Sequence, residues 1–160
     1  MIKFLLISRF CSYPSWQGPA QHIRTFANLL IENNYKVKVI SGEYIEKEET
    51  IIQDGYELFK VPIKYLNKTV DKVSAFSYNE KVHSYIAKDI INKFNPDIIH
   101  VGVPLQMGEF IKVAHEMNKP IVSIVHSYEW ICMQKFLLNS NHEICSGPSY
   151  DKCLNCTIGY

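Results

Sequence analysis

The residue best suited to chemistry is His126, which directly follows the apolar run Ile121–Val125. Four apolar residues in five predict a fully buried central strand, and parallel α/β sheets bind ligands at the carboxyl ends of such strands. An imidazole can donate or accept a proton near neutral pH, so we expect His126 to be catalytic. Glu129 could orient that imidazole or bind a hydroxylated ligand, and the flat face of Trp130 suits a sugar ring. The alternative, a half-buried histidine bonded to a backbone carbonyl, stays open.

A second group of reactive side chains lies further along the chain. Four of the five cysteines are spaced C-x12-C-x7-C-x2-C. Four thiolates can complete the tetrahedral shell of a structural zinc, and the last pair has the spacing of a zinc knuckle. The metal would bind Cys132, Cys145, Cys153 and Cys156, while Cys11 stands apart. Reduced structural cysteines are the alternative, and nothing in the spacing favours an iron–sulfur cluster, which also uses four thiolates.

Composition and charge exclude several classes of function. The 160-residue chain balances 17 basic against 16 acidic residues, whereas a nucleic-acid groove needs a clustered basic face. No run approaches the roughly 18 apolar residues of a membrane span, and Met1–Ile7 is too short for a signal peptide. We therefore expect a cytoplasmic protein. Peripheral contact with the inner face of a membrane is an alternative, because a helix would align four lysines on one face. Pro62 argues against such a helix. The lysines are Lys60, Lys64, Lys68 and Lys72.

The elements that must position these residues follow from hydrophobic periodicity. Short apolar runs predict strands, and apolar residues at helical spacing predict helices between them. The glutamate-rich stretch Glu43–Thr50 is expected to be a solvated surface segment. This alternation predicts an α/β fold, a Rossmann-like doubly wound parallel sheet. The expected strands are Ile2–Ser8, Val37–Ile40, Tyr56–Val61, Asp97–Val101 and Ile121–Val125, and the expected helices cover about 20–32, 75–94 and 107–117.

Three loops leave the carboxyl ends of the predicted strands: Arg9–Pro19, Gly102–Gln106 and His126–Ile131. In an open sheet such loops meet at one crevice, so Gly18 and Gly102 are candidate substrate-binding residues. The first loop runs into a helix, whose N-terminal amides and dipole favour a phosphate or carboxylate. A plain turn glycine is the alternative for Gly18. The G-x-G-x-x-G fingerprint of dinucleotide binding is absent, which argues against an NAD enzyme.

Three segments together resemble the N-terminal domain of family 4 glycosyltransferases. They are Lys3–Leu30, with its strand, glycine-containing loop and apolar helix; Asn95–His100; and Lys119–His126. The resemblance implies the GT-B architecture, in which two Rossmann-like domains face each other across a cleft. It also implies transfer of a sugar from a nucleotide-sugar, with retention of anomeric configuration and without a required metal. Family members commonly have two adjacent glycines in the first loop, where this chain has one.

By this likeness, Gly18 belongs to the loop near the donor diphosphate, and His126 matches a histidine near the transferred sugar. The acceptor would be a glycan or a lipid-linked glycan, in surface polysaccharide synthesis. We expect a Rossmann-like domain over residues 1–131 and a cysteine-containing insertion over 132–160, which resembles an insertion of some members.

The donor-binding half of such an enzyme is expected beyond Tyr160, so these residues alone should show negligible activity. Two other functions stay open. One is a non-catalytic binding module that needs a separate donor-domain partner, and the other is a zinc-stabilised interaction domain.

Overall fold

The computed structural model describes residues 1–63, 81–128, 131–132, 136–139 and 141–158. Six strands of these residues form one sheet in the order β3-β4-β2-β1-β5-β6. Every neighbouring pair is parallel except β3 and β4, so the predicted α/β, Rossmann-like class is confirmed. The strands are β1 (Lys3–Arg9), β2 (Lys36–Glu43), β3 (Glu49–Gln53), β4 (Tyr56–Pro62), β5 (Ile98–Val101) and β6 (Ile121–Ser123), and the helices are α1 (Gly18–Glu32), α3 (Lys81–Phe94), α4 (Gly108–Glu116) and α5 (Tyr150–Ile158).

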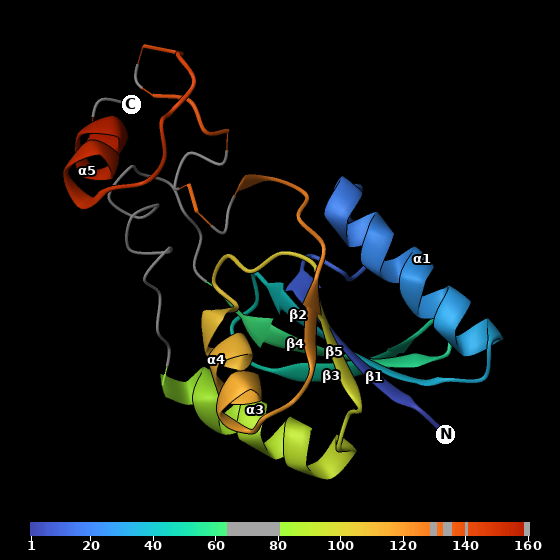
Figure 1. Ribbon diagram of the computed structural model, residues 1–160. Helices are drawn as coiled ribbons and strands as arrows, with labels where there is room; N and C mark the ends of the chain where they lie inside the picture. The colour runs from blue at the N-terminus through green and yellow to red at the C-terminus, as the bar shows by residue number, and fades with distance from the viewer. Residues whose placement is uncertain (64–80, 129–130, 133–135, 140, 159–160) are drawn as a thin grey trace.

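Helices cover the two faces of the sheet unequally (Figure 1). Helix α1 packs on one face, against a cluster that includes Leu6, Val39 and Leu58. Helices α3 and α4 pack on the other face, over residues such as Ile7 and Ile99. Because β1 is buried from both sides, its sequence is almost continuously apolar, as is typical of a parallel sheet. The sheet therefore places the carboxyl ends of β1 and β5 side by side beside α1.

The start and end of α1 follow from local sequence. Pro19 stands in the first turn, where its missing N–H breaks no helical hydrogen bond. The predicted apolar stripe buries Ile23, Ala27 and Leu30 against the sheet. Asn34 has a φ of 61°, a left-handed conformation typical of the residue after a helix.

The prediction that Glu43–Thr50 is a solvated surface segment holds except at its first residue, because residues 46–50 are all exposed. Glu43 is the last residue of β2 and only 8% exposed, and β3 begins at Glu49. Strand β3 pairs with β4 through the two-residue turn Asp54-Gly55, in which both φ angles are positive. Such a turn matches the twist of a hairpin, which is why this glutamate-rich stretch continues into a strand.

The prediction of a fully buried central strand over Ile121–Val125 is wrong. Strand β6 covers only Ile121–Ser123 and lies at the edge of the sheet, paired with β5 alone. Val122 is 53% exposed and Val125 is 64% exposed. An apolar run does not reveal its place in the strand order, and here no described strand lies beyond β6.

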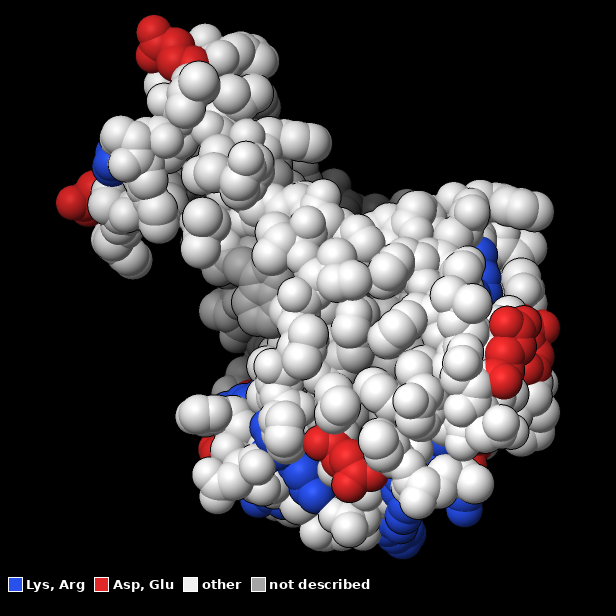
Figure 2. All heavy atoms as spheres, turned by 45° about the vertical axis from the view of Figure 1, so that its right-hand side comes forward, with Lys and Arg blue, Asp and Glu red and all other residues white. Residues whose placement is uncertain are grey.

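Residues 64–80 lie outside the described chain, so the predicted start of the helix at about Ala75 and three of the four lysines suggested for membrane contact are not described. The fourth, Lys60, forms an ion pair of 2.7 Å with Glu49 on the neighbouring strand. None of the described helices is both long and apolar enough to span a membrane. Figure 2 shows one face of the molecule, which is largely uncharged except along its lower and right-hand edges and in the C-terminal segment.

Candidate functional site

Three histidine rings lie together on the α1 side of the sheet. His22 stands one turn into α1, His100 lies on β5, and His126 follows β6. The ring centroids of His22 and His126 are 5.2 Å apart, and those of His22 and His100 are 5.9 Å apart. We call these three residues the histidine cluster. His126 is exposed and His100 is buried, so the cluster runs from the interior of the domain to its surface.

The buried member of the cluster has no hydrogen-bond partner in the described chain. His100 is 5% exposed, yet both of its ring nitrogens lack a partner there, and so does Nε2 of His22. Burial, together with the smaller effects of the nearby His22 and His126, lowers the pKa of His100 to about 4. Burial, followed by the charge of His126, also lowers the pKa of His22. His100 is thus a core histidine whose ring nitrogens have no hydrogen-bond partner in the described chain.

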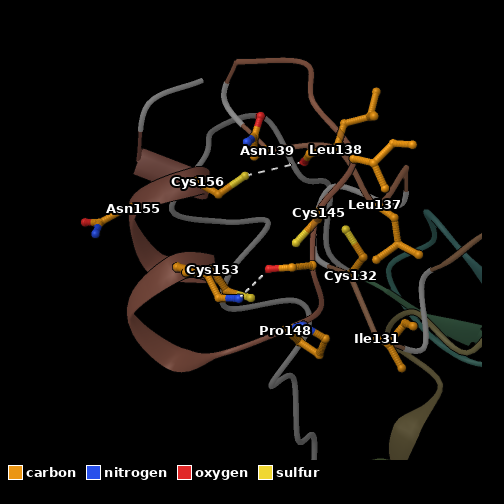
Figure 3. A pocket seen from close by; sticks show the side chains of 13 residues that line it. Ile131, Cys132, Leu137, Leu138, Asn139, Cys145, Pro148, Cys153, Asn155 and Cys156 are labelled. Atoms are coloured by element: carbon orange, nitrogen blue, oxygen red, sulfur yellow. Dashed lines mark hydrogen bonds between the residues drawn. The ribbon is translucent and has the colours of Figure 1, made fainter.

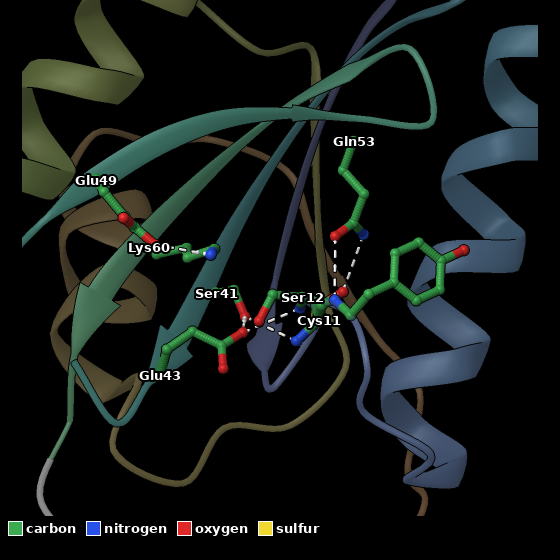
Figure 4. Close-up of polar contacts among 8 residues, drawn as sticks. Cys11, Ser12, Ser41, Glu43, Glu49, Gln53 and Lys60 are labelled. Carbon is green, nitrogen blue, oxygen red and sulfur yellow. Dashed lines mark hydrogen bonds and ion pairs between the residues drawn. The ribbon is translucent and has the colours of Figure 1, made fainter.

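Polar side chains from β2 and β3 fix the loop that follows β1 (Figure 4). The Cys11 amide donates to Ser41 Oγ at 2.8 Å, and the Ser12 amide donates to Glu43 Oε1 at 3.0 Å. Gln53 Nε2 donates to the Cys11 carbonyl at 3.0 Å. The loop is thus held to the ends of two strands by hydrogen bonds, in addition to the apolar packing of Cys11 and Phe10.

Helix α1 holds the same loop from the other side. The buried Arg24 donates from Nη2 to the Ser15 carbonyl at 2.5 Å, and its guanidinium lies 4.8 Å from the centre of the Tyr13 ring. Phe10, the first residue of the loop, has a φ of 56°, which costs a bulky residue of order 1 kcal/mol and occurs mostly at functional or tightly constrained positions. Beside it lies a pocket of about 520 Å³, whose lining includes Phe10, Tyr13, Glu43 and Tyr44.

The two predicted substrate-binding glycines differ in their surroundings. Gly18 is exposed, is the first residue of α1, and has nothing within 4 Å of the position where a Cβ would be. Gly102 is buried, and a Cβ there would lie 2.9 Å from Ile23 and 3.0 Å from Ser8 Oγ. Close packing of Gly102 against β1 and α1 therefore explains why a glycine stands at this position.

Two of the predicted site residues, Glu129 and Trp130, lie outside the described residues. Two residues beside the site, His22 and Arg24, were not predicted from the sequence. The spacing offered one signal for His22, because it lies four residues after Gly18 and therefore one turn further along the same helix face.

The four cysteines of the C-terminal segment line one pocket of about 310 Å³ (Figure 3). None of the chain's cysteines is in a disulfide. Within the described ranges, no three Cys, His, Asp or Glu side chains are already arranged to hold one metal ion. The four cysteines predicted to bind zinc thus line the same pocket, but their sulfur atoms are not arranged around one metal position. These residues are Cys132, Cys145, Cys153 and Cys156.

No family model matches the sequence, and no curated protein matches it. The C-terminal domain of the PF1911 hydrogenase from Pyrococcus furiosus is similar over 78% of this chain and 91% of that chain, with 12% identity and a TM-score of 0.50. A structure described as trehalose-6-phosphate from E. coli bound with UDP-2-fluoro glucose is similar over 99% of this chain and 38% of that chain, with 14% identity and a TM-score of 0.46. The first likeness shows the fold alone, and the second adds no argument. The fold therefore defines a Rossmann-like α/β protein.

Proposed function

We propose that this chain is the acceptor-side part of a retaining glycosyltransferase, which moves a sugar from a nucleotide-sugar to a glycan or lipid-linked acceptor. The observation that carries the proposal is the 5.2 Å separation between the ring centroids of His126 and His22. An exposed imidazole after β6 thus lies beside the first turns of α1, and this nearness supports the proposal. The three resembling segments of the sequence supply the reaction class.

The N-terminal end of α1 suits the charge that develops during such a transfer. When a sugar leaves a nucleoside diphosphate, negative charge grows on the departing phosphate, and fixed amides and a helix dipole stabilise that charge. Gln17, the residue before α1, makes no side-chain hydrogen bond to the first turn. The exposed Gly18 leaves room for a ligand to approach this end of the backbone.

The histidine cluster would supply neutral hydrogen-bonding groups beside that charge. Because burial lowers the pKa of His22 and His100, both imidazoles are uncharged at neutral pH. The exposed His126 is then free to orient a sugar hydroxyl or to stabilise positive charge at the reacting carbon. The loop pocket beside Phe10 and Tyr44 offers space for part of the acceptor.

The proposal is tested by binding of sugar ligands to the purified chain, with two single variants. UDP-glucose, GDP-mannose and the disaccharides cellobiose and chitobiose serve as probes in saturation-transfer NMR. We expect at least one probe to bind, and we expect His126→Ala to weaken that binding at least tenfold. His115→Ala is the matched control, because His115 is an exposed histidine on α4, on the opposite face of the sheet.

Two results would overturn the proposal. One is that no probe binds the wild-type chain at millimolar concentration, and the other is that both alanine variants bind equally well. Sugar transfer is a separate readout: we expect none from these residues alone, so turnover of a nucleotide-sugar by the purified chain would contradict the restriction to the acceptor side.

A further inference from the structure

The described part of the C-terminal segment (residues 131–132, 136–139 and 141–158) has regular structure but little apolar core of its own. A β-bridge joins Leu138 to Ile144, and α5 follows it. Ile144 is 88% exposed and Tyr150 is 82% exposed. Within the described chain, α5 makes no extensive contact with another helix or strand, and Figure 1 shows it apart from the sheet. Segments below about 40 residues usually need a disulfide, a metal or a partner to hold such structure.

The cysteines are placed where a cross-link would hold this segment together. Cys132 precedes the bridge in the sequence and Cys145 follows it, so these two residues flank the bridged segment, which we call the hairpin. Cys153 and Cys156 are three residues apart on α5, which puts both on one face of the helix. Figure 3 shows all four side chains around one pocket, which Leu137 and Pro148 also line.

Two of the four sulfur atoms donate weak hydrogen bonds to backbone carbonyls. Cys145 Sγ lies 3.4 Å from the Gly147 carbonyl, and Cys156 Sγ lies 3.7 Å from the Leu138 carbonyl. A thiol is a weak donor, so rotating these side chains inward costs little. Lys152 lines the same pocket, and its ammonium group would offset part of the negative charge of bound thiolates.

We propose that Cys132, Cys145, Cys153 and Cys156 bind one zinc ion as four thiolates and that this zinc fixes the hairpin to α5. Four S–H groups lose their protons to solvent and four Zn–S bonds form, with no change of oxidation state. The sulfur atoms are not yet close enough to share one ion, so the site closes by rotation of side chains when zinc binds. Since four thiolates leave no open position, the zinc is structural rather than catalytic. This inference does not depend on the proposed transferase function.

The experiment combines metal analysis with a count of thiols on the full chain. The wild-type chain, purified under reducing conditions with zinc supplied, should contain one zinc per chain by mass spectrometry of the metal. Cys153→Ser and Cys156→Ser should each lose most of it. Cys11→Ala is the matched control and should retain it, because Cys11 is buried in the sheet domain away from the pocket.

A second measurement does not depend on the variants folding. Titration of the metal-free wild-type chain with Co²⁺ should give the intense near-ultraviolet charge-transfer absorption of cobalt thiolates, and one equivalent of Zn²⁺ should abolish it. In the denatured chain with a chelator, all five cysteines should react with a thiol reagent. The proposal is overturned by one reactive thiol, which would mean two disulfides, or by five thiols with no stoichiometric metal and no cobalt absorption.

Discussion

Replacing His100 by phenylalanine is expected to stabilise the fold at neutral pH. The ring is 5% exposed, both of its nitrogens lack a partner in the described chain, and its centroid lies 5.0 Å from that of Phe26. A buried polar group without a hydrogen bond costs about 1–3 kcal/mol. Phenylalanine removes two such groups while keeping a flat ring. Its larger ring must fit into the same space, and this overpacking offsets part of the stabilisation. We expect a net increase of about 1–2 kcal/mol in the free energy of unfolding at pH 7.

The same substitution should remove part of the acid sensitivity of the fold. The pKa of His100 is about 4 in the folded protein against a usual value of 6.5, so the unfolded chain binds the proton first as the pH falls. The stability that a neutral His100 contributes is fully present above pH 6.5 and is lost as the pH falls toward 4. Between pH 7 and pH 5 this loss amounts to about 2 kcal/mol. The advantage of His100→Phe over wild type should grow by that amount.

Urea unfolding followed by circular dichroism at pH 7 and pH 5 measures both effects. Comparing two chains at each pH cancels the titration of carboxylates that they share. His115→Gln is the control, because that histidine is exposed on α4 and should change stability by only a few tenths of a kcal/mol at either pH. If His100→Phe is less stable than wild type at pH 7, the argument from the unpartnered ring nitrogens fails. If its advantage does not grow on acidification, the argument from the lowered pKa of His100 fails.

Two further predictions concern the packing and the polar contacts around the site. Gly102→Ala should lower the free energy of unfolding by about 1–3 kcal/mol, because the new Cβ would lie 2.9 Å from Ile23. Gly108→Ala, which meets nothing within 4 Å, should leave stability unchanged or slightly raised; equal effects in thermal melts would contradict this packing. Glu43→Gln should cost about 1–3 kcal/mol, because its buried carboxylate accepts two hydrogen bonds, at 3.0 Å and 2.6 Å. Glu49→Gln, which loses only a half-exposed ion pair, should cost less than about 1 kcal/mol in the same urea titrations, and the reverse order would refute the buried role of Glu43.

Much of the fold could be predicted because its signals are local. The apolar run at β1 and the helical stripe of α1 depend only on residues that are near one another in sequence, and both elements lie within a few residues of their predicted positions. Strand β3 was missed, although Asp54-Gly55 between apolar residues is a strong hairpin signal. The strand was missed because the glutamates before that turn are typical of a solvated surface segment.

The features that could not be predicted depend on contacts between distant parts of the chain. The exposure of β6 follows from strand order, which an apolar run does not encode. The histidine cluster joins residues of α1, β5 and the segment after β6, and no spacing in the sequence connects them. Likewise, the close packing of Ile23 and Ser8 against Gly102 joins segments that are distant in the sequence.

The most direct measurement is a crystal structure of the chain with a sugar ligand from the binding assay. We predict density for the ligand between the His126 imidazole and the N-terminal end of α1, with a ring nitrogen of His126 within hydrogen-bonding distance of a sugar hydroxyl. A ligand bound elsewhere, such as in the cysteine-lined pocket, or an unchanged and solvent-facing His126, would contradict a sugar-handling role for the histidine cluster.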